Sequence, residues 1–196
     1  LSHEPRIQQL VDDLTRLGHG PFPMPVGVMR DERNPQKSRC IRCDTCDGYP
    51  CMVDAKADAD VNCVRPIHHQ DNVTLITNAH VTKLITGPNG REITAVEAKI
   101  AGGETTQFHG DIVIVSCGAI NSAALLLRST SAAHPNGLAN SSDQVGRNFM
   151  FHQAGAILSV HATKHNPSRY QKTFAVNDFY FGEPGFNFPM GGIQLI

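Results

Sequence analysis

The sequence lacks an excess of charge of either sign. Its 17 Lys and Arg residues are balanced by 18 Asp and Glu residues, which leaves a net charge of -1. A surface balanced in this way has no overall field to attract nucleic acid or an anionic membrane, so we expect neither as a partner. The sequence also lacks an apolar run of roughly 20 residues, the length that a membrane-spanning helix requires.

Other absences concern the N-terminus and the cysteines. The first residues, Leu1 to Pro5, include no initiator Met and no apolar secretory segment, so the chain starts as though cut from something longer. Four of the six cysteines fall between Cys40 and Cys51, while Cys63 and Cys117 stand apart. This is not the evenly spaced framework of a small disulfide-rich secreted domain, and it leaves the compartment open.

A hydrophobic content of 40% over 196 residues is enough for the core of one ordinary domain or of two partial ones. The first predicted element is a helix over 2–18, with Ser2 as a cap, Pro5 in the first turn and Gly18 as a stop. Apolar residues recur on one face of this helix at Ile7, Leu10, Val11, Leu14 and Leu17.

Proline and glycine divide the remaining irregular parts of the chain. Three prolines within 20–25 exclude a helix and predict an extended linker into the polar, cysteine-rich loop 31–51. A second loop covers 133–146. A strand is predicted at 155–162, followed by a Tyr- and Phe-rich stretch at 170–188.

The segment 72–129 carries the clearest pattern. Strands are predicted at 73–76, 81–85, 93–100, 105–109 and 111–115. Turn signals at 88–90 and 102–103 make the middle of this series an antiparallel meander. The last strand is a continuous apolar run typical of a parallel strand buried on both faces, and a helix over 121–128 follows it. This order predicts an α/β fold.

Gly118 lies between the predicted buried strand and the helix. A glycine turn of this kind brings backbone N–H groups and a helix N-terminus to the carboxyl end of a sheet, where α/β proteins bind ligands. The alternative is that Gly118 only allows the chain to turn tightly.

Three segments in the right order resemble the glucose-methanol-choline (GMC) oxidoreductases. They are RCIRCDTCDGYPCMVDAKADADV from Arg39 to Val61, IVSCGAINSAALLLRS from Ile114 to Ser129, and VGRNFMFH from Val145 to His152. The second segment departs from the family pattern at Ala123 and Thr130, where Pro and Gly are usual. Neither position carries a group that would do chemistry.

The resemblance implies an internal piece of an FAD-dependent enzyme that oxidises a CH–OH group of an alcohol or sugar by hydride transfer to FAD. The chain contains no GxGxxG turn for the cofactor pyrophosphate, and the family's catalytic His lies in a segment without a counterpart here. We therefore assign no catalytic residue, and we expect this piece alone to be inactive.

The resemblance also implies which residues lie against the cofactor. Val81, after Asn78-Ala79-His80, corresponds to the family residue whose backbone pairs with the adenine of FAD, although a plain core valine is the alternative. Ser116, Cys117, Gly118 and Ala119 correspond to the turn that runs close under the cofactor. Backbone groups suit these tasks because an adenine edge needs one donor and one acceptor.

The cysteine-rich loop carries the rival hypothesis of a metal or iron–sulfur electron-transfer module. Cys40, Cys43, Cys46 and Cys51 have a spacing that can aim several thiolates at one point. Related sequences have cysteines here without metal, so structural cysteines are the alternative, and we assign no metal ligand.

Four further residues have two interpretations each. Lys56 matches a position that is often basic in the family, or else it forms a surface ion pair. His152 ends the third segment and lies either near the flavin or in a structural hydrogen bond. His68 and His69 are expected to be exposed loop residues.

Together these features predict three parts. Residues 1–71 form a helix, a connector and the cysteine-rich loop; 72–152 form part of an FAD/NAD(P)-binding domain with a β-meander; and 153–196 form part of an α+β, antiparallel-sheet substrate domain. Cutting such domains uncovers apolar faces, so self-association is a further expectation.

Overall fold

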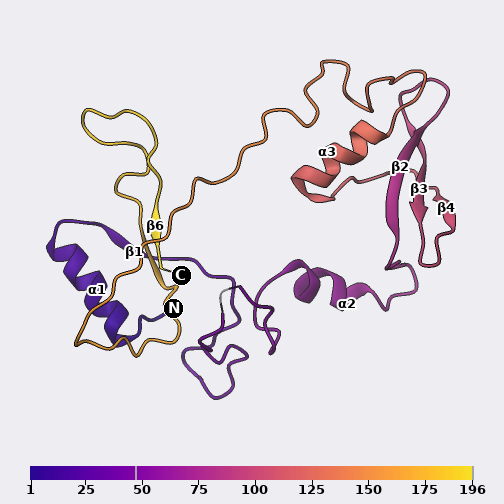
Figure 1. The fold of residues 1–196 in the computed structure, drawn as a ribbon. Coiled ribbons are helices and arrows are strands. Elements are labelled where there is room, and N and C mark those ends of the chain that lie inside the picture. The colour runs from indigo at the N-terminus through magenta and orange to yellow at the C-terminus, as the bar shows by residue number, and fades with distance from the viewer. Residues whose placement is uncertain (47, 196) are drawn as a thin grey trace. The chain divides into compact units, whose positions relative to one another are not determined.

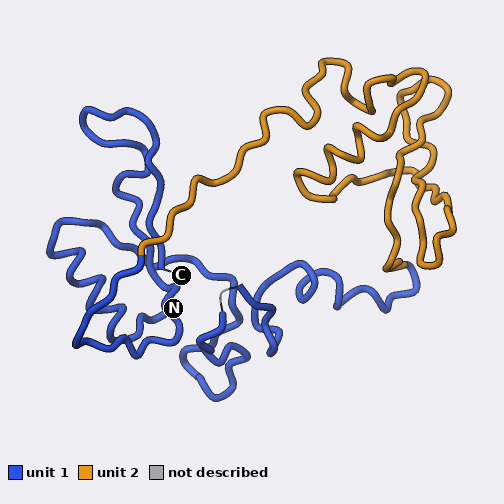
Figure 2. The backbone as a smooth tube through the Cα atoms, in the orientation of Figure 1, with its two compact units in different colours: residues 1–73, 158–196 blue, residues 74–157 orange. Residues whose placement is uncertain are grey.

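A computed structural model describes residues 1–46 and 48–195 and divides into two compact units (Figures 1 and 2). Unit 1 comprises Leu1–Val73 and Leu158–Ile196, and unit 2 comprises Thr74–Ile157. The two ends of the chain therefore belong to the same unit. Within the described residues, no helix is both long enough and apolar enough to cross a membrane.

Unit 1 begins with helix α1, Pro5–Arg16, which confirms the predicted helix with shorter bounds. The residue before the helix is Glu4, and Ser2 does not cap it; the backbone N–H of Ser2 instead donates to a carboxylate oxygen of Glu32, 2.9 Å away. Leu17 was predicted on the buried face but is 75% exposed. The helix ends at Arg16, so Leu17 no longer follows the helical period.

A small antiparallel sheet lies beside α1. Its strands are β1 (Pro21–Pro23), β5 (Phe174–Val176) and β6 (Ile193–Gln194), in the order β1-β5-β6. The interpretation of 20–25 as a linker was therefore wrong, although the predicted extended backbone is present. Two prolines are tolerated in β1 because it is an edge strand, with only one neighbour to bond.

The core of unit 1 joins α1 to this sheet. Ile7 has no exposed surface and packs with Phe174 and Val176 from β5. Leu10, Val11, Leu14 and Leu195 surround this centre. The Glu4 carboxylate adds a polar link, since it accepts the N–H groups of Arg169 at 2.9 Å and Tyr170 at 3.0 Å. The helix face predicted from the sequence is thus buried by a strand more than 160 residues away.

The cysteine-rich loop leads into two short helical elements, η1 (Asp60–Val64) and α2 (Arg65–Ile67). The guanidinium group of Arg65 pairs with Asp54 at 2.8 Å and with Asp60 at 2.7 Å. These side chains are about half exposed, so each pair contributes little to stability, at most about 1 kcal/mol.

Unit 2 contains the predicted meander. Strands β2 (His80–Thr86), β3 (Ile93–Lys99) and β4 (Thr105–Phe108) form an antiparallel sheet in the order β2-β3-β4. Helix α3, Gly118–Arg128, packs against β2 (Figure 1). Leu84, Ala95, Ala98 and Leu125 are the buried apolar residues between them. The combination of helix and sheet agrees with the predicted α/β class.

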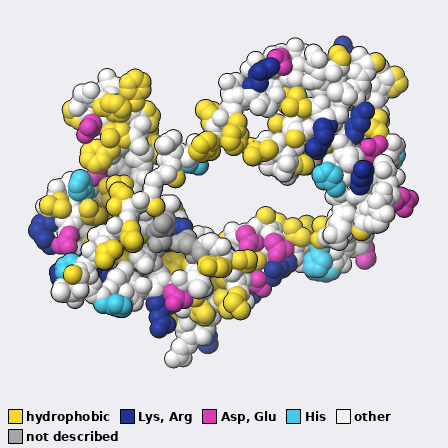
Figure 3. Space-filling view, in the orientation of Figure 1, with side chains coloured by type: hydrophobic (Ala, Val, Ile, Leu, Met, Phe, Trp, Pro, Cys, Tyr) yellow, Lys and Arg dark blue, Asp and Glu magenta, His cyan; other side chains and the backbone are white. Residues whose placement is uncertain are grey.

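Three predicted strands are absent from the described structure. The segments 73–76, 111–115 and 155–162 have no strand pairing. Ile112 and Ile114 are each 83% exposed, and Ile157 is 97% exposed. A parallel strand needs a hydrogen-bonded neighbour and covered faces, and no other described segment supplies them here. Figure 3 shows many apolar side chains at the surface.

Candidate functional site

The turn 116–119 leads directly into helix α3. Cys117 precedes the helix and its N–H donates to the Ser122 hydroxyl, 3.1 Å away. All four residues of the turn are exposed. The helix therefore starts about one turn earlier than the predicted 121–128, and its first residues are exposed.

Gly118 has a backbone conformation that favours glycine. Its φ is +78°, and a Cβ added there would meet no atom within 4 Å. Crowding within this chain therefore does not exclude a side chain. The open space beside the backbone leaves room for a ligand to approach closely, which a Cβ would obstruct.

The backbone orientation of Val81 follows from the pairing of the meander. Ile100 N–H donates to the Glu104 carbonyl at 2.9 Å, so Ile100 faces β4. Ala98, two residues earlier on β3, faces β4 as well, because hydrogen-bonding direction alternates along a strand. Val81 pairs with Ala98, so its N–H and C=O point away from β3 towards the open edge of β2. One donor and one acceptor are thus available side by side.

Ser129 fixes α3 against that same edge of β2, a role that sequence reasoning missed. Its hydroxyl donates to the Leu125 carbonyl at 2.6 Å and accepts the Leu84 N–H at 2.9 Å. Ser129 is 2% exposed, so its hydroxyl gives the buried Leu84 N–H an acceptor inside the fold. The signal was present as a serine at the helix end, but only the fold shows which strand it meets.

No hydrogen bond among the described residues joins Val81 to the 116–119 turn. The hydrogen bond from Leu84 of β2 to Ser129 lies at the C-terminal end of α3. The 116–119 turn is at the other end, an 11-residue helix away. A ligand that touches both must therefore be elongated, as a dinucleotide is.

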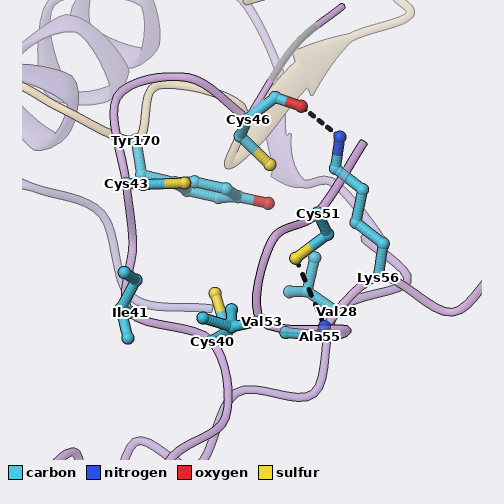
Figure 4. A pocket seen from close by; sticks show the side chains of 10 residues that line it. All are labelled: Val28, Cys40, Ile41, Cys43, Cys46, Cys51, Val53, Ala55, Lys56 and Tyr170. Atoms are coloured by element: carbon cyan, nitrogen blue, oxygen red, sulfur yellow. Dashed lines mark hydrogen bonds between the residues drawn. The ribbon is translucent and has the colours of Figure 1, made fainter. Parts of the chain in front are cut away.

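The four clustered cysteines line a small hollow in unit 1 (Figure 4). Its volume is about 20 Å³, and Lys56 and Tyr170 contribute to its wall. This is space for about one water molecule. All six cysteines lie in the described residues, and no disulfide joins any of them. Among the described residues, no three His, Cys, Asp or Glu side chains are grouped so that they could hold a metal ion.

Cys51 has an unusual environment within this hollow. Ala55 N–H donates to the Cys51 sulfur, with 3.2 Å between nitrogen and sulfur. This bond lowers the pKa of the Cys51 thiol; burial opposes the effect, and the N–H groups of Val53 and Lys56 and the Lys56 ammonium add to it. Cys51 is therefore more thiolate at neutral pH than an ordinary cysteine.

Among the described residues Lys56 forms no ion pair, which was one of the two interpretations considered for it. Its ammonium group donates to the backbone carbonyl of Cys46 and, at 2.7 Å, to that of Tyr49. A single cation thus holds two points of the cysteine-rich loop. The backbone of Lys56 also pairs with that of Val28 in an isolated antiparallel bridge.

The candidate histidines lie at the surface. His68 and His69 are exposed, as predicted, and their rings meet edge to face with centroids 5.7 Å apart. His152 is exposed and lies outside any helix or strand. No hydrogen bond of its side chain is present among the described residues, and its place near the flavin stays a prediction.

Comparison with known proteins identifies the family. A family model described as GMC oxidoreductase matches residues 24–154. The chain is 33% identical over 132 residues to 6'''-hydroxyparomomycin C oxidase of Streptomyces lividus. It is 33% identical over 133 residues to paromamine 6'-oxidase of Streptomyces fradiae and 27% identical over 149 residues to gluconate 2-dehydrogenase flavoprotein of Pantoea cypripedii.

These matches cover 67%, 68% and 74% of the chain, and in each case 24% of the relative. The chain thus spans about a quarter of the length of the curated relatives it matches. The family's cofactor is FAD, and the matched model is that of the family's FAD-binding domain. The match covers more than half of the chain, which therefore belongs to the GMC oxidoreductase family.

Proposed function

We propose that this chain is part of an FAD-dependent oxidoreductase that oxidises a CH–OH group of an alcohol or sugar. The family match supports an oxidoreductase. Two of the relatives are named oxidases, of 6'''-hydroxyparomomycin C and of paromamine, and one is named gluconate 2-dehydrogenase. The first of these names denotes a hydroxylated substrate, which favours the CH–OH group as the site of oxidation.

In this proposal unit 2 contributes to the FAD site. The backbone N–H and C=O of Val81 pair with the adenine edge, and the turn from Ser116 to Ala119 lies along the cofactor. The observation that carries this assignment is the open edge of β2, where a donor and an acceptor of one residue face away from the sheet. The space beside Gly118 fits a cofactor in close approach. FAD, when bound, supplies the hydride acceptor.

The proposed division of the chain follows the sequence prediction. Residues 72–152 form part of the FAD-binding domain, and 153–196 form part of an antiparallel-sheet substrate domain. No residue of this chain is assigned the role of the catalytic base. The contribution of the described residues is therefore to bind and orient the cofactor, and the observed β5–β6 pairing supports an antiparallel sheet in the second part.

Val81→Pro tests the adenine contact. Proline removes the N–H of residue 81 but no hydrogen bond between β2 and β3, because this N–H points to the open edge. We expect the affinity of the chain for FAD to fall about tenfold, the effect of losing one hydrogen bond to a buried acceptor. The dissociation constant is measured by titration of FAD, followed by its fluorescence.

Val81→Ala is the matched control. It shortens the side chain and keeps the backbone N–H that makes the proposed contact, so the dissociation constant is expected to stay within about twofold of the original. Circular dichroism checks that both variants keep the sheet. Equal weakening by the two substitutions would show that the side chain, and not the backbone, carries the effect, and would overturn the assignment.

A further inference from the structure

The cysteine-lined hollow of unit 1 combines features that the proposed function does not use. Cys40, Cys43, Cys46 and Cys51 line one space, and Lys56 stands beside it. Figure 4 shows the sulfurs of Cys46 and Cys51 on the same hollow, with the Lys56 side chain running alongside. No cofactor contact has been assigned to any of these groups.

We propose that Cys51 is a site of covalent oxidation by hydrogen peroxide, and that Cys46 is the cysteine that then closes a disulfide with it. This inference rests on unit 1 alone and does not depend on the proposed function. Its chemical basis is a thiol held by a backbone N–H next to a fixed cation, with a second thiol on the same hollow.

Backbone donors and charge favour the reactive form of Cys51. The Ala55 N–H, 3.2 Å from the sulfur, directly stabilises a thiolate. Lys56 is fixed by the carbonyls of Cys46 and Tyr49, so its positive charge stays next to the hollow. The other titratable groups that line it are Cys40, Cys43, Cys46 and Tyr170. No Asp or Glu is among the described residues that line the hollow, so no carboxylate of this lining opposes a thiolate at Cys51.

The size of the hollow suits a small oxidant. About 20 Å³ is space for roughly one water molecule, and hydrogen peroxide is only slightly larger. A bulky disulfide such as oxidised glutathione does not fit. Cys51 itself is half-buried, so it is reached from solvent while most of its surroundings are apolar.

The reaction balances in two steps. The Cys51 thiolate attacks one peroxide oxygen, the O–O bond breaks, and sulfenic acid and hydroxide form; sulfur is oxidised and peroxide is reduced. The Cys46 thiol then attacks the Cys51 sulfur, a sulfur–sulfur bond forms, and the hydroxyl leaves as water with the thiol proton. A thiol reductant reverses the second product to two thiols.

Labelling of the reduced chain with iodoacetamide tests the first part. Cys63 and Cys117 are exposed, whereas Cys51 is half-buried, so exposure alone predicts that Cys63 and Cys117 react first. We expect Cys51 to react several-fold faster than either at pH 7, because its larger thiolate fraction outweighs the loss of intrinsic nucleophilicity. Cys63 or Cys117 reacting faster than Cys51 would overturn the proposal.

Treatment of the same chain with hydrogen peroxide tests the second part. Trypsin leaves Cys43, Cys46 and Cys51 on one peptide that ends at Lys56. We expect this peptide to lose two hydrogens, and fragmentation to place the bond between Cys46 and Cys51. In Cys46→Ser the disulfide is lost and dimedone traps the sulfenic acid at Cys51; in Cys51→Ser both products are lost, whereas Cys63→Ser, the control, changes neither.

Two results contradict the assignment. A disulfide on that peptide that persists in Cys46→Ser removes the role given to Cys46. Oxidation that begins at Cys63 or Cys117, with the 43–56 peptide unchanged, removes the role given to Cys51. The iodoacetamide labelling, the peroxide treatment and the location of the disulfide by fragmentation are first carried out on the unsubstituted chain, so these results do not depend on the folding of a variant.

Discussion

Gly137→Ala is expected to destabilise unit 2 by about 3 to 5 kcal/mol, from backbone strain and a clash with backbone atoms. Gly137 has a φ of +100°, which L side chains rarely adopt, and an added Cβ would lie 2.8 Å from the Leu127 Cα and 3.1 Å from the Leu126 carbonyl oxygen. Leu138 N–H donates to that same carbonyl at 2.8 Å. The loop after α3 therefore docks on the helix end only if residue 137 has no side chain.

The measurement is urea denaturation, with hydrogen exchange of α3 amides to assign the change to unit 2. Gly103→Ala is the matched control. Its φ is +86°, but an added Cβ would meet no atom within 4 Å, so we expect a loss of only about 1 kcal/mol from backbone conformation. Equal losses for the two variants would show that the close approach at Gly137 contributes nothing.

Ile7→Ala is expected to destabilise unit 1 by about 2 to 4 kcal/mol. Ile7 has no exposed surface and lies in a small core whose other buried members, among the described residues, are Phe174 and Val176. Removing its methyl and methylene groups leaves a cavity that such a small core has few side chains to fill. The loss is read from urea denaturation and from faster hydrogen exchange of β5 amides.

The control for this prediction is on the same helix. Leu17 is 75% exposed, so Leu17→Ala is expected to change the free energy of unfolding by less than about 0.5 kcal/mol. Comparable losses at the two positions would mean that α1 is not packed on β5 through Ile7.

The sequence patterns that proved correct are local ones. The meander was predictable because the turns at 88–90 and 102–103 set the pairing of β2 with β3 and of β3 with β4. Helix α1 was predictable from its apolar period and α3 from its Ala- and Leu-rich composition. In each case residues close in sequence supply the hydrogen bonds, so the local signal is sufficient.

The incorrect predictions concern segments that need distant partners. The apolar run 111–115 has the composition of a buried parallel strand, but no described segment pairs with it. The opposite error occurred at Pro21–Pro23, where proline content indicated a linker and β5, some 150 residues later, makes it a strand. The composition of a segment indicates whether its side chains suit a buried strand, but it does not indicate which other segment will pair with that strand.

In the candidate site too, the residue types could be predicted from the sequence, whereas the contacts between distant residues could not. Val81 and Gly118 were predicted from the family resemblance, whereas the open edge that exposes the Val81 backbone depends on strand register. The link from Ser129 to Leu84 and the Lys56 contacts with the cysteine-rich loop were not predicted. Each joins groups 7 to 45 residues apart, and the pattern of residue types carries no signal for such pairs.

Amide NMR of the chain during titration with FAD shows whether the Val81 backbone and the turn before α3 bind the cofactor. We expect saturable chemical-shift changes at the Val81 amide and at the amides of Cys117, Gly118 and Ala119, with one common dissociation constant. The proposed FAD site would be contradicted if these amides did not shift at FAD concentrations that saturate the shift changes of the other residues.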